Sequence, residues 1–307
     1  MNVFVIVVIY NGEKWINQCF GSLRRSDLKL NMIAVNNASS DNSVQLLRTE
    51  FPEVSVIESE ENLGFGRGNN LGLRTAYEQE ADYVFLLNQD AWVEPDTIRK
   101  LIDVHKTDPS FGVVSPIQLT ASGQNLDAGF LGCLRKAVCR DLVPDLYFGR
   151  VEDRVYEMTF VPAAAWLLSK ACLDRVGGFN PTFFHYGEDN NYIQRVLYHG
   201  MKAGAYPYSV VYHDSEFRQK SALNSGEGLE FKTKLMKYSN PLIKTDINRE
   251  AKKYLRAAVG SALRLSVTRY KAAMEKYRMY SAVRPVLERN LDLSKKVGPA
   301  FLVEEKT

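Results

Sequence analysis

The sequence predicts an α/β fold with a mostly parallel sheet, a mixed sheet extension and a helical module at the C-terminal end. Three observations support this prediction. Short β-branched runs alternate with helix-patterned segments through about the first 120 residues. The pattern becomes shorter and less regular from about 111 to 168, and strand signals vanish beyond about 226. We therefore expect one domain at residues 1–226 and a helical module at residues 227–307.

The elements follow in order along the chain. The expected strands are apolar runs rich in β-branched or aromatic residues, at Val3–Ile9, Met32–Asn36, Val54–Glu58, Tyr83–Asn88, Gly112–Pro116, Phe160–Leu168 and Ser209–Tyr212. The expected helices have apolar residues at helical spacing, at Gly12–Arg24, Ser43–Glu50, Gly68–Gln79 and from Glu188 to about His199. This order predicts stacked β-α-β units followed by a less regular half.

Composition excludes several classes of protein. With 45% hydrophobic and 24% charged residues the chain is neither disordered nor a small disulfide scaffold. Lys and Arg number 39 against 36 Asp and Glu, which argues against a dedicated nucleic-acid binder. The four cysteines form no C-x-x-C pair, so neither a zinc site nor a disulfide framework is expected. No apolar run approaches the ~18 residues of a membrane span, and we expect a cytoplasmic protein.

Polar residues rich in Asn follow each of the first four strands, where ligands bind in an open parallel sheet. The glycines between Gly64 and Gly72 fail the G-x-G-x-x-G spacing in both frames, which disfavours a nicotinamide enzyme. They still predict a place where the backbone approaches a ligand closely and a helix N-terminus faces phosphate. A flexible loop before a helix is the alternative interpretation.

Asp90 and His213 are candidate metal ligands, because each follows a predicted strand. An Asp and a His can share a divalent ion with a nucleotide diphosphate. Each is also compatible with a structural role, since Asp often forms turns.

Glu188 and Asp189 lie at the start of a predicted helix. Acids at this place are stabilised by the helix dipole, which is the purely structural interpretation. Asp189 shares a helix face with Ile193 and Val196, whereas Glu188 aligns with Tyr192. We therefore expect Asp189 to face a cleft, where it would act as a general base.

Several motifs in a fixed order resemble glycosyltransferase family 2, over roughly residues 1–215. They are VIYNG at 8–12, VNNASSD at 35–41, ENLGFGRGNN at 61–70, LLNQD at 86–90, GGF at 177–179 and YGED at 186–189. Among members of the family, the chain is most similar to the bacterial rhamnosyltransferase-like enzymes.

The resemblance implies a GT-A fold, an inverting reaction, a nucleotide-sugar donor and a divalent metal, Mg²⁺ or Mn²⁺. It implies that Asp189 is the catalytic base, with Glu188 beside it, that Asp90 and His213 bind the metal, and that Trp166 borders the acceptor. The implied nucleotide-sugar contacts are Val8, Tyr10, Asn36, Arg67, Asn70, Asn88, Gln89 and Asp90. Two departures stand out: Asn36 replaces the usual base-binding Asp, and Asn88 replaces the first acid of the metal motif.

The function that follows is transfer of a sugar from dTDP-rhamnose or a UDP-sugar to a hydroxyl of a glycan or lipid-linked acceptor, in bacterial surface polysaccharide synthesis. Two alternatives stay open. A nucleotide-sugar-binding protein without transfer activity would account for Asn88. A nucleotidyltransferase would usually carry a Gly-rich basic signature near its N-terminus, whereas residues 8–17 contain only Gly12 and Lys14.

The C-terminal module is basic. Between Glu227 and Asn290 there are 15 Lys and Arg against 6 Asp and Glu. A solvated helical bundle packed on the first domain explains this most simply. The alternatives are a patch for peripheral contact with the inner face of a membrane, since anionic lipids attract clustered cations, and a homodimer interface.

Overall fold

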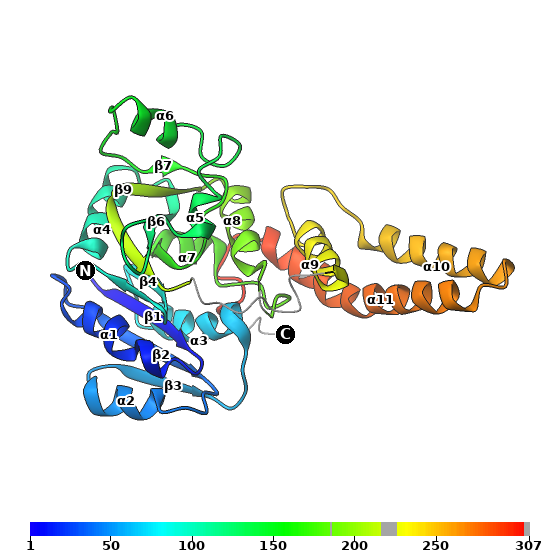
Figure 1. Cartoon of the computed structure of the whole chain (residues 1–307), viewed down its shortest axis with the longest axis horizontal. Helices are drawn as coiled ribbons and strands as arrows, with labels where there is room; N and C mark the ends of the chain where they lie inside the picture. Colours follow the sequence, from blue (N-terminus) through cyan, green and yellow to red (C-terminus); the bar gives the residue numbers. More distant parts are fainter. Residues whose placement is uncertain (185, 216–225, 304–307) are drawn as a thin grey trace.

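The computed structural model describes residues 1–184, 186–215 and 226–303. Its centre is a nine-stranded mixed sheet of order β3-β2-β1-β4-β8-β6-β9-β5, with β7 paired to β9 (Figure 1). The strands are β1 Val3–Ile9, β2 Asn31–Asn37, β3 Ser55–Ser59, β4 Tyr83–Asn88, β5 Ala91–Val93, β6 Phe111–Thr120, β7 Tyr156–Glu157, β8 Ala165–Ser169 and β9 Lys202–His213.

Helices cover both faces of the sheet. They are α1 Ile16–Arg24, α2 Ser43–Glu50, α3 Gly64–Glu78, α4 Thr97–Thr107, α5 Ala128–Leu131, α6 Leu142–Tyr147, α7 Lys170–Val176 and α8 Glu188–Tyr198. Buried side chains of α3, α7 and α8 form one core with the sheet, and those of α1, α2 and α4 form a second core with its other face. Two packed faces of this kind are the expected layers of an α/β domain.

The predicted parallel half is confirmed. Strands β3, β2, β1 and β4 pair in parallel, within a residue or two of the expected bounds. The mixed half begins where β8 joins β4 in the antiparallel sense. There β9 is longer than predicted, since it begins at Lys202 rather than Ser209, and the short strands β5 and β7 were not predicted.

Helix α3 begins at Gly64, one turn before the predicted start. Its glycines bring the helix close to β1: a Cβ at Gly72 would lie 2.6 Å from Cγ2 of Ile6, and one at Gly68 would lie 3.0 Å from Cγ1 of Val8. The predicted close approach therefore exists, but it is made to other parts of this chain.

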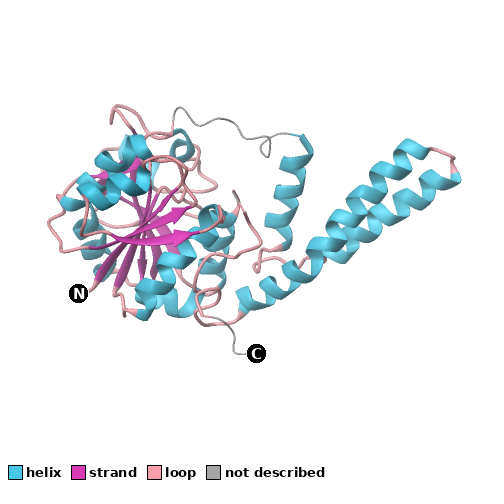
Figure 2. Cartoon of the chain, turned by 90° about the horizontal axis from the view of Figure 1, so that it is seen from below, coloured by secondary structure: helices cyan, strands magenta, loops and turns pink. Residues whose placement is uncertain are grey.

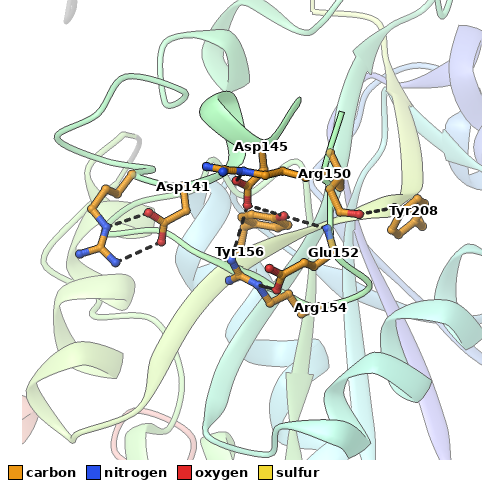
Figure 3. A network of polar contacts seen from close by, with 9 residues as sticks. Asp141, Asp145, Arg150, Glu152, Arg154, Tyr156 and Tyr208 are labelled. Atoms are coloured by element: carbon orange, nitrogen blue, oxygen red, sulfur yellow. Dashed lines mark hydrogen bonds and ion pairs between the residues drawn. The ribbon is translucent and has the colours of Figure 1, made fainter. Parts of the chain in front are cut away.

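The segment between β6 and β8 is held by a polar network (Figure 3). Asp145 accepts hydrogen bonds from Nε of Arg150 at 2.8 Å and from the hydroxyl of Tyr156 at 2.9 Å. The guanidinium of Arg154 lies 4.1 Å from the centroid of the Tyr156 ring. The hydroxyl of Tyr208 on β9 donates to a backbone carbonyl of this segment at 3.0 Å. The network fixes the segment to the sheet.

Beyond the sheet lie α9 Gly226–Tyr238, α10 Ile247–Leu263 and α11 Val267–Lys295, which have a small core of their own. Both views show α10 and the facing part of α11 as a hairpin that projects away from the sheet (Figures 1 and 2). The chain then returns to the first domain, where Leu302 is fully buried and the carbonyl of Ala300 accepts from the backbone N–H of Gly178 at 2.8 Å. No helix in the described ranges is both long and apolar enough to cross a membrane.

Candidate active site

Strand pairing brings Asp90 and His213 together. β5 begins directly after Asp90 and pairs with β9 so that Ala91 lies opposite His213. Oδ1 of Asp90 is 3.3 Å from Nε2 of His213, and Nδ2 of Asn88 is 3.4 Å from the same nitrogen. Both Asp90 and His213 are buried. Residues 123 positions apart thus form one polar cluster at the end of β4.

Asp127, which no sequence motif indicated, completes this cluster. Its Oδ2 is 3.2 Å from Nδ1 of His213 and accepts a hydrogen bond from Ser215. Its Oδ1 caps α5 by accepting from the backbone N–H of Gly129 at 2.8 Å. Burial alone would raise the pKa of Asp127, but the hydrogen bonds from His213 and Ser215 outweigh burial and lower it. An Asp at the start of a helix is a capping signal, yet nothing local connects Asp127 with His213.

The cluster fits a divalent metal held together with a diphosphate. With Nδ1–H donated to Asp127, Nε2 of His213 presents its lone pair to the carboxylate of Asp90. A positive charge between the two atoms, either a proton or a metal ion, relieves their repulsion. A carboxylate and an oriented imidazole suit Mg²⁺ or Mn²⁺. The described residues offer no group of three or more His, Cys, Asp or Glu ligands, so phosphate and water would complete the shell.

Glu188 and Asp189 begin α8 immediately after Gly187, whose φ of 102° favours glycine. Glu188 is the more deeply buried of the two, and Asp189, which helical spacing predicts to face a cleft, is half-buried. Burial, followed by the charge of Asp189, raises the pKa of Glu188 to about 7. Burial also raises the pKa of Asp189. The hydrogen bond that its carboxylate accepts from the backbone N–H of Asn190 at 2.7 Å lowers this pKa, but burial has the larger effect.

The glycines of α3 support this acidic pair. A Cβ at Gly66 would lie 3.3 Å from Cβ of Glu188 and 3.1 Å from Cβ of Phe179. Gly64, with a φ of 76°, packs against the backbone of Phe184, where a Cβ would clash with the carbonyl. Small residues in α3 thus let the start of α8 lie directly against it.

Helix α9 lies beside the acidic pair, although no pattern in the sequence predicts this contact. Nζ of Lys232 lies 4.4 Å from the centroid of the Tyr186 ring, and Nδ2 of Asn191 donates to the carbonyl of Ser239 at 2.9 Å. A Cβ at Gly187 would lie 2.9 Å from Cγ of Met236. The charge of Lys232 lowers the pKa of both acids, whereas burial raises it and has the larger effect.

The predicted nucleotide contacts at the strand ends are tied to one another. Oε1 of Gln89 accepts from the backbone N–H of Tyr10 at 2.9 Å, and its Nε2 donates to the carbonyl of Tyr10 at 3.1 Å. The Tyr10 side chain itself is exposed. Asn36 donates to Glu58 at 2.6 Å and accepts from the backbone N–H of Ser39 at 3.0 Å. These hydrogen bonds hold the strand ends together and leave the Tyr10 side chain exposed beside them.

Other predicted contacts occupy structural positions. The side-chain amide of Asn70 accepts a hydrogen bond from the backbone N–H of Phe179 at 2.7 Å and donates one to the carbonyl of Phe179 at 2.8 Å. These two bonds fix the segment before α8 to α3. Trp166 is fully buried and stacks on Phe179, with ring centroids 6.2 Å apart. The ring of Trp166 packs in the core, and the expectation that this segment borders the acceptor stays a prediction. The side chain of Val8 packs against Gly68, and the half-buried Arg67 lies 3.7 Å from Glu61.

Two family models match the chain. One is described as Glycosyl transferase family 2 and covers residues 4–129, and the other is described as Glycosyl transferase family group 2 and covers residues 83–277.

Curated relatives agree with these matches. The chain is 24% identical over 203 residues to the low-salt glycan biosynthesis hexosyltransferase Agl10 of Haloferax volcanii, covering 65% of this chain and 63% of the relative. It is 29% identical over 115 residues to a UDP-N-acetylglucosamine–dolichyl-phosphate N-acetylglucosaminyltransferase of Methanococcus voltae, covering 33% and 45%. The chain therefore spans less than two thirds of either relative.

Solved structures share the fold. The Staphylococcus aureus TarS 1–349 complex with UDP-GlcNAc has a TM-score of 0.56 at 14% identity, covering 96% of this chain and 90% of that one. The mannosyltransferase PcManGT of Pyrobaculum calidifontis, in complex with GDP-Man and Mn²⁺, has a TM-score of 0.54 at 19% identity, covering 96% and 86%. The predicted GT-A fold is confirmed, and the chain belongs to the family 2 glycosyltransferases.

Proposed function

We propose that this chain is an inverting glycosyltransferase that uses a nucleotide-diphosphate sugar. Asp189 takes the proton of an acceptor hydroxyl, whose oxygen attacks the anomeric carbon. The bond from this carbon to the diphosphate breaks as the new bond forms, and the nucleotide diphosphate leaves with the bonding electrons. General-base help of this kind contributes about 10²–10⁴-fold.

The observation that carries this proposal is the division of roles between the two acids. Burial and the charge of Asp189 raise the pKa of the deeply buried Glu188 to about 7, so its carboxyl group keeps a proton to a higher pH than an ordinary glutamate does. Asp189 is less buried and accepts a backbone hydrogen bond, so it is better able to carry the negative charge. Neighbouring carboxyl groups in different environments are typical of an acid–base site.

Asp90 and His213 would hold the divalent metal, with Asp127 fixing the imidazole from behind. When bound, the ion neutralises charge that develops on the leaving diphosphate. Asn88 contributes a neutral amide where an acid would strengthen the site, so we expect modest metal affinity. The Mn²⁺ in the PcManGT structure supports a divalent ion.

For the donor we propose dTDP-rhamnose or a UDP-sugar, and for the acceptor a hydroxyl of a glycan or lipid-linked glycan in surface polysaccharide synthesis. UDP-GlcNAc in TarS supports a sugar on a nucleotide diphosphate. The names of Agl10 and of the Methanococcus enzyme support glycan and lipid-phosphate acceptors. This reaction would take place in the cytoplasm or at the inner face of its membrane.

A nucleotide-sugar-binding protein without transfer activity is the second candidate, because Asn88 removes one acid from the metal motif. The acidic pair argues against it, because burying one carboxyl group beside another is costly, and such a pair is suited to proton transfer.

Asp189→Asn tests the proposal. We expect the variant to keep the thermal stabilisation given by the matching UDP- or dTDP-sugar with Mn²⁺, while transfer of radiolabelled sugar falls about 10²–10⁴-fold. Asp103→Asn, on the exposed face of α4, is the matched control and should keep both properties. Unchanged transfer by Asp189→Asn would refute the assigned base. Donor binding by the unaltered chain without any product would favour the binding protein.

A further inference from the structure

The hairpin formed by α10 and the facing part of α11 ends in an apolar turn. Leu263, Leu265 and Val267 are 82%, 90% and 64% exposed at this turn, far from the sheet (Figures 1 and 2). Leu265 has a φ of 52°, in the left-handed region that favours glycine, so a large aliphatic residue is held there despite backbone strain. No segment of the described ranges covers these three side chains.

Exposed cations surround the turn. Between Ala251 and Met274 there are six basic residues and no acidic one, and all six are exposed: Lys252, Lys253, Arg256, Arg264, Arg269 and Lys271. Of the acids nearer the base of the hairpin, Glu250 contacts Lys234 and Glu230 lies 3.3 Å from Lys276, whereas Glu275 at the inner edge of this stretch is exposed. The outer half of the hairpin therefore presents positive charge beside apolar side chains.

We propose that the outer half of this hairpin, residues 251–274, docks on an anionic lipid surface. The three aliphatic side chains at the turn enter the boundary between headgroups and acyl chains, and the six cations pair with lipid phosphates. Apolar residues flanked by Lys and Arg are typical of helices that lie on membranes. No covalent step is involved.

Two features of the hairpin disfavour other occupants. In a symmetric dimer the same patch meets itself, so a second copy docked on this face would bring its six cations against six more without an acid between them. A nucleic acid would satisfy the charge, but it would leave Leu263, Leu265 and Val267 in water. A lipid surface satisfies both the charge and the exposed aliphatic side chains.

Docking at this place would orient the active site. The hairpin is continuous with the small core that holds α9, and α9 carries Lys232 against Tyr186 beside the acidic pair. A docked hairpin would hold Asp189 at a fixed height above the lipid headgroups, which suits a lipid-linked acceptor. This consequence rests on the proposed function, whereas docking itself does not.

Vesicle sedimentation with the full chain tests the proposal. We expect the unaltered chain to pellet with phosphatidylglycerol-containing vesicles at low salt, to be released at high salt, and not to pellet with pure phosphatidylcholine. A double variant, Leu263→Ser with Leu265→Ser, and a triple variant, Arg264→Gln, Arg269→Gln and Lys271→Gln, should each lose at least about tenfold of the binding. Circular dichroism would show that each variant remains folded.

The matched control replaces three exposed cations of the first domain, Arg25→Gln, Lys29→Gln and Lys136→Gln, and should bind as the unaltered chain does. No sedimentation at low salt overturns the proposal, as does equal loss of binding in the control and hairpin variants. A dimer by light scattering that disappears in the double variant would also overturn it, in favour of a second copy. None of these readouts needs sugar transfer, so a failure here is distinguishable from a failure of the proposed function.

Discussion

Replacing Glu188 with Gln should make the protein more stable, and the gain should depend on pH. Burial and the neighbouring Asp189 raise the pKa of Glu188 from its ordinary value of 4.5 to about 7. Between these two values the folded state keeps a proton that the unfolded state has released, so stability falls as the pH rises. The full difference corresponds to about 3 kcal/mol once the pH is above 7.

Gln has nearly the shape of protonated Glu and cannot ionise, so Glu188→Gln avoids this cost. The free energy of unfolding of the variant should exceed that of the unaltered chain by under about 1 kcal/mol near pH 5 and by about 3 kcal/mol near pH 8.5. Urea denaturation at the two pH values measures both differences. Glu275→Gln, at an exposed position on α11, is the control and should give the same small difference at both.

Two results would contradict this reasoning. A gain of equal size at both pH values would show that the carboxyl group of Glu188 does not titrate differently in the folded state. A variant less stable than the unaltered chain near pH 8.5 would show that the ionised carboxylate has compensating partners. The predicted cost also has a functional meaning, because active-site groups are often retained at the expense of stability.

Three further predictions concern packing, the acidic pair and the metal cluster. Gly72→Ala should destabilise the fold by about 1–3 kcal/mol, because the new Cβ would lie 2.6 Å from the Ile6 side chain. Gly260→Ala on α10, where a Cβ would meet nothing within 4 Å, should instead raise the free energy of unfolding by about 0.5–1 kcal/mol. Urea denaturation of both variants measures these changes. Lys232→Met should move the rising limb of the pH–rate profile up by about one pH unit, because it removes a charge that lowers the pKa of Glu188 and Asp189. Lys237→Met, at an exposed position of α9, is the control. An unmoved profile in Lys232→Met would contradict the role of Lys232. Asp127→Asn should weaken Mn²⁺ binding by about 10–100-fold by calorimetry, because a neutral amide replaces the carboxylate whose charge holds the His213 ring. An unchanged Kd would refute this.

Local patterns were enough to predict much of the fold. The apolar runs at Val3–Ile9 and Tyr83–Asn88 became β1 and β4 with the predicted bounds, and Ser43–Glu50 became α2. Strand and helix periodicity act over a few residues, and parallel pairing follows from the short crossover helices between strands. The polar motifs at the strand ends also indicated the family, because each motif is a short local segment that can be recognised along the sequence.

The sequence by itself therefore determined the parallel half of the sheet, the polar strand ends and the presence of an acidic pair at the start of a helix. Only the tertiary structure decided that Glu188 is the deeply buried acid, that Asp127 holds His213, and that Lys232 stands beside both acids. It also placed Trp166 in the core. The physical reason is distance along the chain: these contacts depend on β5 pairing with β9 and on α9 docking beside α8, which are set by packing of the whole domain and leave no local pattern.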